Sequence, residues 1–187
     1  MNTIKFDNKN TLVVAHRGLS GIERENTASA FVAAGNRNYF GIETDIYRTS
    51  DGHFVVNHDG RANRVGGMNV TMEATPWELL REIVLYDTDG TKDRYDLRLP
   101  SLENYISICK KYEKYCVLEL KSVFTPEETA KVIEAMGGLH PAYEFVRAAI
   151  EAGKNIVTSN KALVANFYDE LIPMAQEKGV CFRCTAA

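Results

Sequence analysis

The stretch from Leu12 to Asp59 constrains the fold of this chain most strongly. It alternates apolar, β-branched runs with polar residues placed where those runs end. Leu12–Ala15 predicts a short buried strand, and Gly41–Tyr47 predicts a second strand. After a turn signal, His53–Asn57 predicts a third strand. Successive short strands of this kind, separated by helical segments, are typical of an α/β fold with a parallel sheet.

Polar side chains that are suited to chemistry follow these predicted strands. His16 and Arg17 come directly after the first strand, and His58 follows the third. Glu43 and Asp45 lie on one face of the second strand, because successive side chains alternate between faces. Parallel α/β folds keep their chemistry at the carboxyl ends of the strands. We therefore expect these five side chains to converge there.

The rest of the chain continues as alternating helices and strands. A fourth strand, Tyr115–Leu120, carries Glu119 near its end and is followed by Lys121. Helices are expected after the cap residues Ser101 and Thr125. Together with the first three strands, these elements make about four strand–helix units, which is half of a (β/α)₈ barrel. Other helices are expected at Glu25–Gly35, at Thr75–Leu80 with Thr75 as cap, at Ala142–Ala152 and at Ala162–Lys178, and strands at Asn155–Thr158 and Val180–Cys184.

The acidic residues suggest a metal site. Glu43, Asp45 and Glu119 would meet at the ends of two strands, and hard divalent cations such as Mg²⁺ or Ca²⁺ prefer oxygen ligands of this kind. The alternative is a trio of acids paired with Arg17 and Lys121. The presence of two histidines in the same region favours the metal site.

The basic residues suggest catalysis on an anionic substrate. His16 and His58 titrate near neutral pH and suit general acid and base roles, although a lone histidine after a strand is more often structural. Arg17 can bind a phosphate oxygen, with a salt bridge at the strand end as the alternative. Lys121 could add positive charge to the same pocket.

Five motifs resemble those of the glycerophosphodiester phosphodiesterases. They are His-Arg-Gly after the first strand, Glu-x-Asp in the second, His-Asp after the third, Leu-Pro-Ser-Leu-Glu at 99–103 and Leu-Glu-Leu-Lys at 118–121, and the resemblance covers about Thr11 to Ala130. It implies a TIM-type barrel, one divalent ion on the three acids, and proton transfer by the two histidines. The implied reaction gives glycerol 3-phosphate and an alcohol.

A second resemblance covers about Val132 to Ala187. The sequence GGLHPAYEFVRAAIEAGKNIVTSNKALVA is similar to the later part of the nucleotide-binding domain of homoserine dehydrogenases. This implies a Rossmann-like αβαβ fragment in which Thr158, Asn160 and Lys161 match the loop beside the nicotinamide. The G-x-G-x-x-G fingerprint is absent from the chain, so NAD(P) is not expected to bind. We interpret the chain as a composite of residues 1–131 and 132–187.

Size and composition limit what such a composite can do. The chain has 187 residues, whereas a TIM barrel typically needs about 250. We therefore expect the phosphodiesterase activity to be impaired; the alternatives are a fragment of a homoserine dehydrogenase or a non-functional chimeric product. The net charge of −3 gives no reason to expect a nucleic-acid partner, and no apolar run is long enough to span a membrane. A cytoplasmic location and a small-molecule substrate are the expectations.

Overall fold

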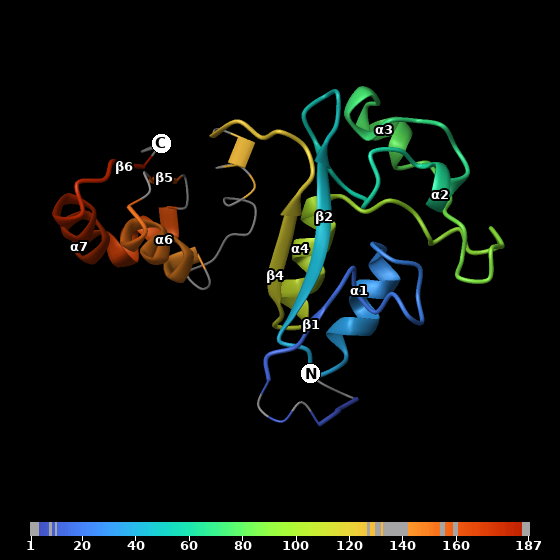
Figure 1. The fold of residues 1–187 in the computed structure, drawn as a ribbon, viewed down its shortest axis with the longest axis horizontal. Coiled ribbons are helices and arrows are strands. Elements are labelled where there is room, and N and C mark those ends of the chain that lie inside the picture. Colours follow the sequence, from blue (N-terminus) through green and yellow to red (C-terminus); the bar gives the residue numbers. More distant parts are fainter. Residues whose placement is uncertain are drawn as a thin grey trace. The chain divides into compact units, whose positions relative to one another are not determined.

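The computed structural model describes residues 4–7, 9, 11–126, 128–129, 132, 142–153, 156–158 and 161–184 (Figure 1). The chain forms two compact units, Met1–Val123 and Phe124–Ala187. All five side chains expected to converge, together with Glu119 and Lys121, belong to the first unit.

The first unit is built around one long strand. β2 (Gly41–Arg48) is parallel to β1 (Val14–Ala15) and to β4 (Tyr115–Leu120), and antiparallel to β3 (Phe54–Val56). Its alternation buries Ile42, Thr44 and Ile46 completely on one face. The opposite face therefore carries the acidic residues of the strand.

The pairing register leaves a gap beside the middle of β2. β4 pairs with Gly41–Ile46 along one edge, so the other edge must hold both β1 and β3. β1 reaches only as far as Ile42, and β3 starts at Ile46. The backbone from Glu43 to Asp45 therefore faces the two segments that follow β1 and β3.

The third strand differs from the expectation. We expected His58 at the carboxyl end of a parallel strand, but β3 runs antiparallel to β2. Because β3 runs back along β2, the residues after it approach the same gap as the loop after β1. The amide of Asn57 donates to the Asp45 carbonyl at 3.1 Å. His58 thus reaches the region of Asp45 by a different route from the one expected.

Two helices cover the buried side of the sheet, α1 (Ala28–Gly35) and α4 (Leu102–Lys111). The predicted cap Ser101 is confirmed, because its Oγ accepts a hydrogen bond from the Asn104 amide at 3.2 Å. α1 begins three residues later than predicted, and Thr27 is its cap. Shorter helices lie between β3 and α4: α2 (Asn63–Gly66), the 3₁₀ turn η1 (Met72–Ala74) and α3 (Trp77–Leu80), which has no side-chain cap at Thr75.

The second unit contains α6 (Ala142–Glu151), β5 (Ile156–Thr158), α7 (Lys161–Glu177) and β6 (Phe182–Cys184). β5 and β6 pair in parallel across α7, so this part of the chain is a β–α–β unit. Its core joins both helices to β5 and includes Val146, Ile150, Ile156, Leu163 and Leu171. The predicted αβαβ order is present, but this order is common to parallel α/β folds and does not establish a Rossmann fragment.

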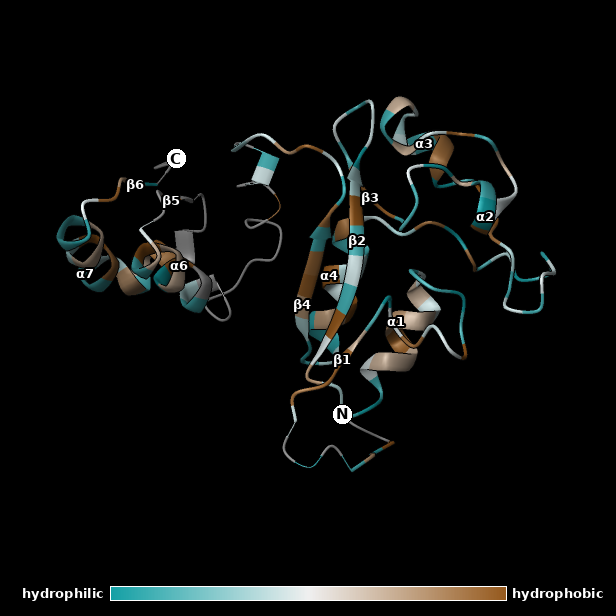
Figure 2. Ribbon diagram, viewed as in Figure 1, coloured by the Kyte–Doolittle hydropathy of each residue, from teal (hydrophilic) through white to brown (hydrophobic). Residues whose placement is uncertain are grey.

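The hydroxyl of Tyr105 ties α4 to the sheet. The Tyr105 side chain is fully buried, and its hydroxyl donates to the Ile42 carbonyl at 2.6 Å and accepts from the Val117 amide at 3.0 Å. It therefore bridges β2 and β4 directly below the acidic face. Figure 2 shows that β4 is apolar along most of its length, so other polar partners for these groups are scarce.

We predict that Tyr105→Phe lowers the free energy of unfolding by about 1–3 kcal/mol, because a buried amide and a buried carbonyl lose their partner. Urea denaturation followed by circular dichroism measures this. Tyr95→Phe is the matched control, since the Tyr95 side chain is 74% exposed and should tolerate the change. An unchanged midpoint for Tyr105→Phe would contradict the bridging role.

Candidate metal and phosphate site

Three carboxylates from two strands lie together. Glu43 and Asp45 belong to β2, and Glu119 on β4 is the register partner of Asp45. One oxygen atom from each of the three residues lies within 4.8 Å of the other two. The side chain of Asp45 is completely buried, that of Glu43 is 14% exposed and that of Glu119 is 56% exposed. The cluster therefore opens to solvent on the side of β4.

Asp45 is a buried anion whose two oxygens have different surroundings. Its Oδ2 accepts a hydrogen bond from Asn26 Nδ2 at 2.9 Å and lies 3.5 Å from Arg17 Nε. Its Oδ1 lies 3.2 Å from Lys121 Nζ, but within the described residues it makes no hydrogen bond. A buried carboxylate oxygen left without a hydrogen bond is costly, so this atom is suited to receive a cation.

Glu43 faces the loop that follows β1. Its Oε2 accepts a hydrogen bond from the Arg17 amide at 2.8 Å and lies 3.9 Å from His16 Nε2. Burial raises the pKa of Glu43, and repulsion from Asp45 raises it further, while the Arg17 amide partly opposes the shift. The folded protein therefore disfavours the ionised form of Glu43, and a cation bound beside the carboxylate would stabilise that form.

The backbone of this loop adopts an unusual conformation that aims the Arg17 amide at Glu43. Arg17 has φ of 57° and Gly18 has φ of 77°. A Cβ atom at Gly18 would lie 2.7 Å from the backbone of Ala30 in α1, so only glycine fits there. Backbone strain of this kind at Arg17 is more typical of functional sites than of ordinary loops.

Asn26 holds the loop against β2. It is 2% exposed and has φ of 55°, a conformation that asparagine tolerates better than most residues. Its backbone amide donates to the Arg17 carbonyl at 3.0 Å, and its side-chain oxygen accepts a hydrogen bond from Thr44 Oγ1 at 2.7 Å. From the sequence, Asn26 was expected only as part of the helix Glu25–Gly35, so this role was not predicted. Asn26 instead links the loop, Thr44 and Asp45.

Lys121 lies between two of the acids. Its ammonium is 2.6 Å from Glu119 Oε1 and 3.2 Å from Asp45 Oδ1. The hydrogen bond to Glu119, reinforced by Asp45, raises the pKa of Lys121. The ion pairs expected under the salt-bridge alternative, with Arg17 and Lys121, are therefore present. Two cations against three carboxylates still leave the cluster negatively charged.

The donor set fits one divalent ion. Calcium binds carboxylate oxygens at roughly 2.3–2.6 Å, so ligands on opposite sides of the ion are roughly 5 Å apart. The observed separations of up to 4.8 Å lie within this limit. A shared ion would also give the buried Asp45 Oδ1 atom a partner beside the Lys121 ammonium, with which it makes an ion pair but, within the described residues, no hydrogen bond.

The two histidines differ in how firmly they are held. His58 Nδ1 lies 2.7 Å from Asp59 Oδ1, and its carbonyl accepts a hydrogen bond from the Tyr47 hydroxyl at 3.2 Å. Its side chain is 32% exposed, whereas that of His16 is 68% exposed and has Glu43 as its ion-pair partner. His58 is therefore fixed on one ring nitrogen, and His16 projects into solvent.

A series of ion pairs connects these segments, and most of the residues that form it were not predicted from the sequence. Asp59 pairs with Arg64, Arg64 with Glu25, and Glu25 with Arg17, which lies 3.5 Å from Asp45. The only signal in the sequence was the basic loop from Arg61 to Gly67. The series joins the His58 turn to the carboxylate cluster.

The residues suggested for cofactor binding lie in the second unit. Thr158 ends β5 and Lys161 begins α7, while Asn160 lies outside the described residues. NAD(P) binding therefore stays a matter of sequence similarity alone.

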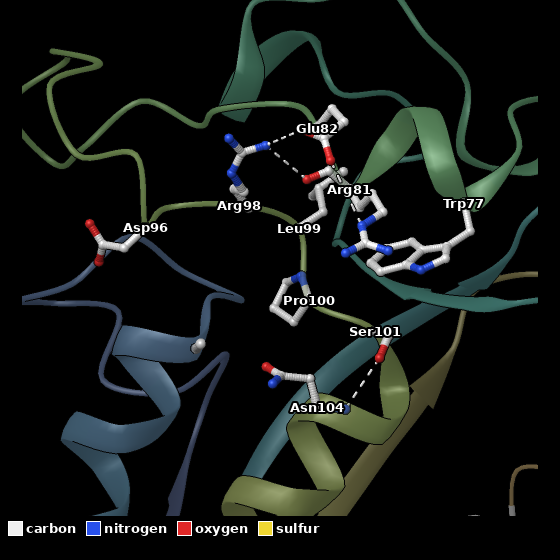
Figure 3. Close-up of a pocket in the computed structure, with 10 residues that line it drawn as sticks. Trp77, Arg81, Glu82, Asp96, Arg98, Leu99, Pro100, Ser101 and Asn104 are labelled. Carbon is white, nitrogen blue, oxygen red and sulfur yellow. Dashed lines mark hydrogen bonds and ion pairs between the residues drawn. The ribbon is translucent and has the colours of Figure 1, made fainter.

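The first unit also contains a separate cavity of about 440 Å³ between α3 and the amino-terminal end of α4 (Figure 3). Trp77 and Pro100 contribute apolar walls. Arg98 donates to Glu82 at 2.9 Å, and Asp96 pairs with Arg94 at 2.8 Å. Its charged groups are thus paired with other protein groups.

Comparison with solved structures identifies the fold. A phosphodiesterase of Oleispira antarctica, solved with its product sn-glycerol-3-phosphate, aligns over 95% of this chain and 85% of its own, with a TM-score of 0.62 at 19% identity. Such neighbours define an α/β fold of the TIM-barrel type. The model of the Glycerophosphoryl diester phosphodiesterase family matches residues 16–177, and the chain belongs to this family.

Sequence relatives agree with this over part of their length. The glycerophosphodiester phosphodiesterase of Caldanaerobacter subterraneus subsp. tengcongensis is 32% identical over 128 residues, which is 67% of this chain and 52% of the relative. The chain thus spans about half the length of the curated relatives it matches first. In the described residues, no helix is both long enough and apolar enough to cross a membrane.

The second resemblance is also found, but only as a short match. The homoserine dehydrogenase of Synechocystis is 39% identical over 69 residues, which is 37% of this chain and 16% of the relative. The phosphodiesterase family match extends to residue 177 and so overlaps the stretch that we assigned to a second parent. A distinct joined fragment is therefore not shown.

We predict that Glu43→Gln stabilises the metal-free protein at pH 7. Because the pKa of Glu43 is raised in the folded state, its contribution to stability is complete below the unfolded value of 4.5 and is lost as the pH rises through the folded value. Glutamine does not ionise, so the variant does not lose this contribution to stability. Urea midpoints in chelator-containing buffer should therefore differ at pH 7 and converge below pH 4.5.

Glu177→Gln is the control, because it removes the same charge at an exposed position of the second unit. If Glu43→Gln were less stable than the wild type at pH 7 without metal, the assignment of a disfavoured buried charge would be wrong.

Proposed function

We propose that this chain is a metal-dependent phosphodiesterase that cleaves glycerophosphodiesters to glycerol 3-phosphate and an alcohol. The observation that carries the proposal is the cluster of Glu43, Asp45 and Glu119, in which a buried oxygen of Asp45 has no hydrogen bond among the described residues. Family membership supports the reaction class. The specific substrate and residue roles are our proposal.

The three carboxylates would hold one Mg²⁺ or Ca²⁺ ion. When bound, such an ion stabilises the negative charge that develops on the phosphodiester oxygens. The protein supplies the ligands on rigid strands: Glu43 and Asp45 are two residues apart on one face of β2, and Glu119 faces Asp45 from β4. The Arg17 guanidinium and the Lys121 ammonium, which already lie beside Asp45, would bind phosphate oxygens.

The two histidines would move the protons. His58 bonded to Asp59 through Nδ1 presents Nε2 to a substrate. His16 follows β1 on the same edge of β2 and lies beside Glu43. One histidine would take the proton of the attacking hydroxyl as its oxygen bonds to phosphorus, and the other would protonate the alcohol oxygen as its bond to phosphorus breaks. Where that hydroxyl is glycerol's own, water then opens the resulting cyclic phosphate to give glycerol 3-phosphate.

The relatives support the substrate class. The Oleispira antarctica structure holds sn-glycerol-3-phosphate, and the Caldanaerobacter relative is a glycerophosphodiester phosphodiesterase. A cytoplasmic location remains part of this proposal.

We predict hydrolysis of sn-glycero-3-phosphocholine that requires Mg²⁺ or Ca²⁺ and is abolished by a chelator. His16→Ala and His58→Ala should each lower kcat about 10²- to 10⁴-fold, the usual contribution of general acid–base catalysis. Release of glycerol 3-phosphate measures this.

His53→Ala is the matched control for the hydrolysis assay. The His53 side chain is 54% exposed and pairs with Asp51 rather than with the cluster. A rate that falls equally in all three variants would contradict the assigned roles, and no metal-dependent hydrolysis by the wild type would contradict the function.

A second candidate rests on the homoserine dehydrogenase match. We propose that the stretch from about Val132 to Ala187 shares its origin with the nucleotide-binding domain of those enzymes, since it is up to 48% identical over 56 residues to the Pseudomonas aeruginosa protein. Thr158, Asn160 and Lys161 would then represent the loop beside the nicotinamide. Without the glycine-rich turn for the pyrophosphate, this stretch would not hold the cofactor.

We predict that thermal unfolding separates the two candidates. Saturation at 100 times Kd by Mg²⁺ or Ca²⁺ stabilises a folded site by about 2.7 kcal/mol, and so should raise the Tm of the wild type. Asp45→Asn should lose this shift, and NADPH should not raise the Tm. If NADPH alone raised the Tm, a working cofactor site of the dehydrogenase type would be favoured over the phosphodiesterase site.

A further inference from the structure

One arginine outside the expected site contacts two carboxylates from different segments. Arg64, in α2, donates through Nε to Asp59 Oδ2 at 2.7 Å. Its two terminal nitrogens donate to the two oxygens of Glu25, at 2.7 and 3.0 Å. The planar guanidinium thus makes a bidentate pair with Glu25 and also bonds to Asp59, a geometry that lysine cannot reproduce.

Each of these carboxylates holds a residue of the proposed site. Asp59 Oδ1 lies 2.7 Å from His58 Nδ1, so the oxygen that Arg64 does not use faces the imidazole. Glu25 Oε1 accepts a hydrogen bond from Arg17 Nη1 at 3.1 Å as well as the one from Arg64. Arg64 therefore connects the turn after β3 to the loop after β1.

We propose that Arg64 is a positioning residue for the proposed phosphodiesterase reaction, which orients His58 through Asp59 and Arg17 through Glu25. Arg64 holds Asp59 so that the carboxylate receives the Nδ1 proton of His58 and leaves Nε2 available to the substrate. It holds Glu25 so that the Arg17 guanidinium stays beside Asp45. The inference rests on the proposed function and adds a residue to it.

The exposure of Arg64 argues for orientation rather than for stability. Its side chain is 45% exposed, and exposed ion pairs contribute little to folding. Yet the Glu25 carboxylate is mostly buried, and although burial raises its pKa, Arg64 and Arg17 together lower it. Likewise the bonds from Arg64 and His58 outweigh burial and lower the pKa of Asp59. Both acids are thus ionised and directed by Arg64 at neutral pH.

Few of the described residues face His58, which makes its tautomer a clear readout. Asp59 contacts the ring, Arg64 lies behind Asp59, and Tyr47 on β2 contacts the backbone carbonyl. Burial raises the pKa of Tyr47, so this hydroxyl stays neutral. Removing Arg64 leaves the Asp59 carboxylate free to turn away from Nδ1, so the imidazole should lose the partner that fixes its tautomer.

The test compares Arg64→Met, Arg64→Lys and Arg61→Met in the whole chain. Arg61 is the matched control: it lies in the same loop, is exposed, and bonds to Asn69 instead of to the acids. Arg64→Met should lower kcat about 10- to 100-fold, with a smaller change in KM, because misplaced groups cost rate more than binding.

Arg64→Lys keeps the positive charge but cannot make the bidentate pair with Glu25. It should recover kcat only in part, and a melting curve checks that both variants fold. Arg61→Met should leave kcat and KM unchanged. If Arg64→Met matched Arg61→Met in both quantities, the positioning role would be overturned.

A readout without substrate separates this inference from the proposed function. The ¹⁵N resonances of His58 report its tautomer in the protein as isolated. In the wild type Nδ1 should carry the proton, and in Arg64→Met the population should spread over both tautomers. If the wild type hydrolyses nothing, the function fails but these spectra still decide the role of Arg64: unchanged His58 signals overturn it.

Discussion

A buried carboxylate with an incomplete set of partners determines how the first unit is arranged. An ionised group without solvent needs cations and hydrogen-bond donors from the protein, because its desolvation costs several kcal/mol. Asp45 receives these from two separate segments: Asn26 and Arg17 from the loop after β1, and Lys121 from beyond β4. The position of each segment is therefore tied to one charge at the centre of β2.

The strands that support this charge were largely predictable, whereas their directions were not. β4 has the predicted bounds, and the alternation in β2 correctly placed Glu43 and Asp45 on one face. A run as short as Phe54–Val56 carries no direction of its own. The short turn before this strand does indicate its direction, because a strand parallel to β2 would need a crossover connection of about a dozen residues or more. The turn at Ser50–Gly52 thus indicates a hairpin, a constraint that the expectation of a parallel strand overlooked.

Side-chain contacts between distant loops were beyond sequence reasoning. Arg64 and Glu25 are 39 residues apart, and Asn26 and Asp45 are 19 apart. Neither pair follows a helical or strand period, so no pattern brings them together. The left-handed backbone of Asn26 is likewise a property of the folded loop, although asparagine is among the residues that tolerate it. The motifs locate the site, but the tertiary fold decides which polar residues support it.

The unequal surroundings of the two histidines follow from the same architecture. His58 follows a hairpin strand and is held by Asp59, so one ring nitrogen already has a partner before any ligand arrives. His16 lies beyond a two-residue strand, and the only ion pair of its largely exposed side chain within the described residues is with Glu43, at 3.9 Å. Glu43 is itself an expected ligand, so a bound cation would compete with His16 for that carboxylate. Binding of the ion and release of the His16 ring toward a substrate would therefore be linked, while His58 stays in place.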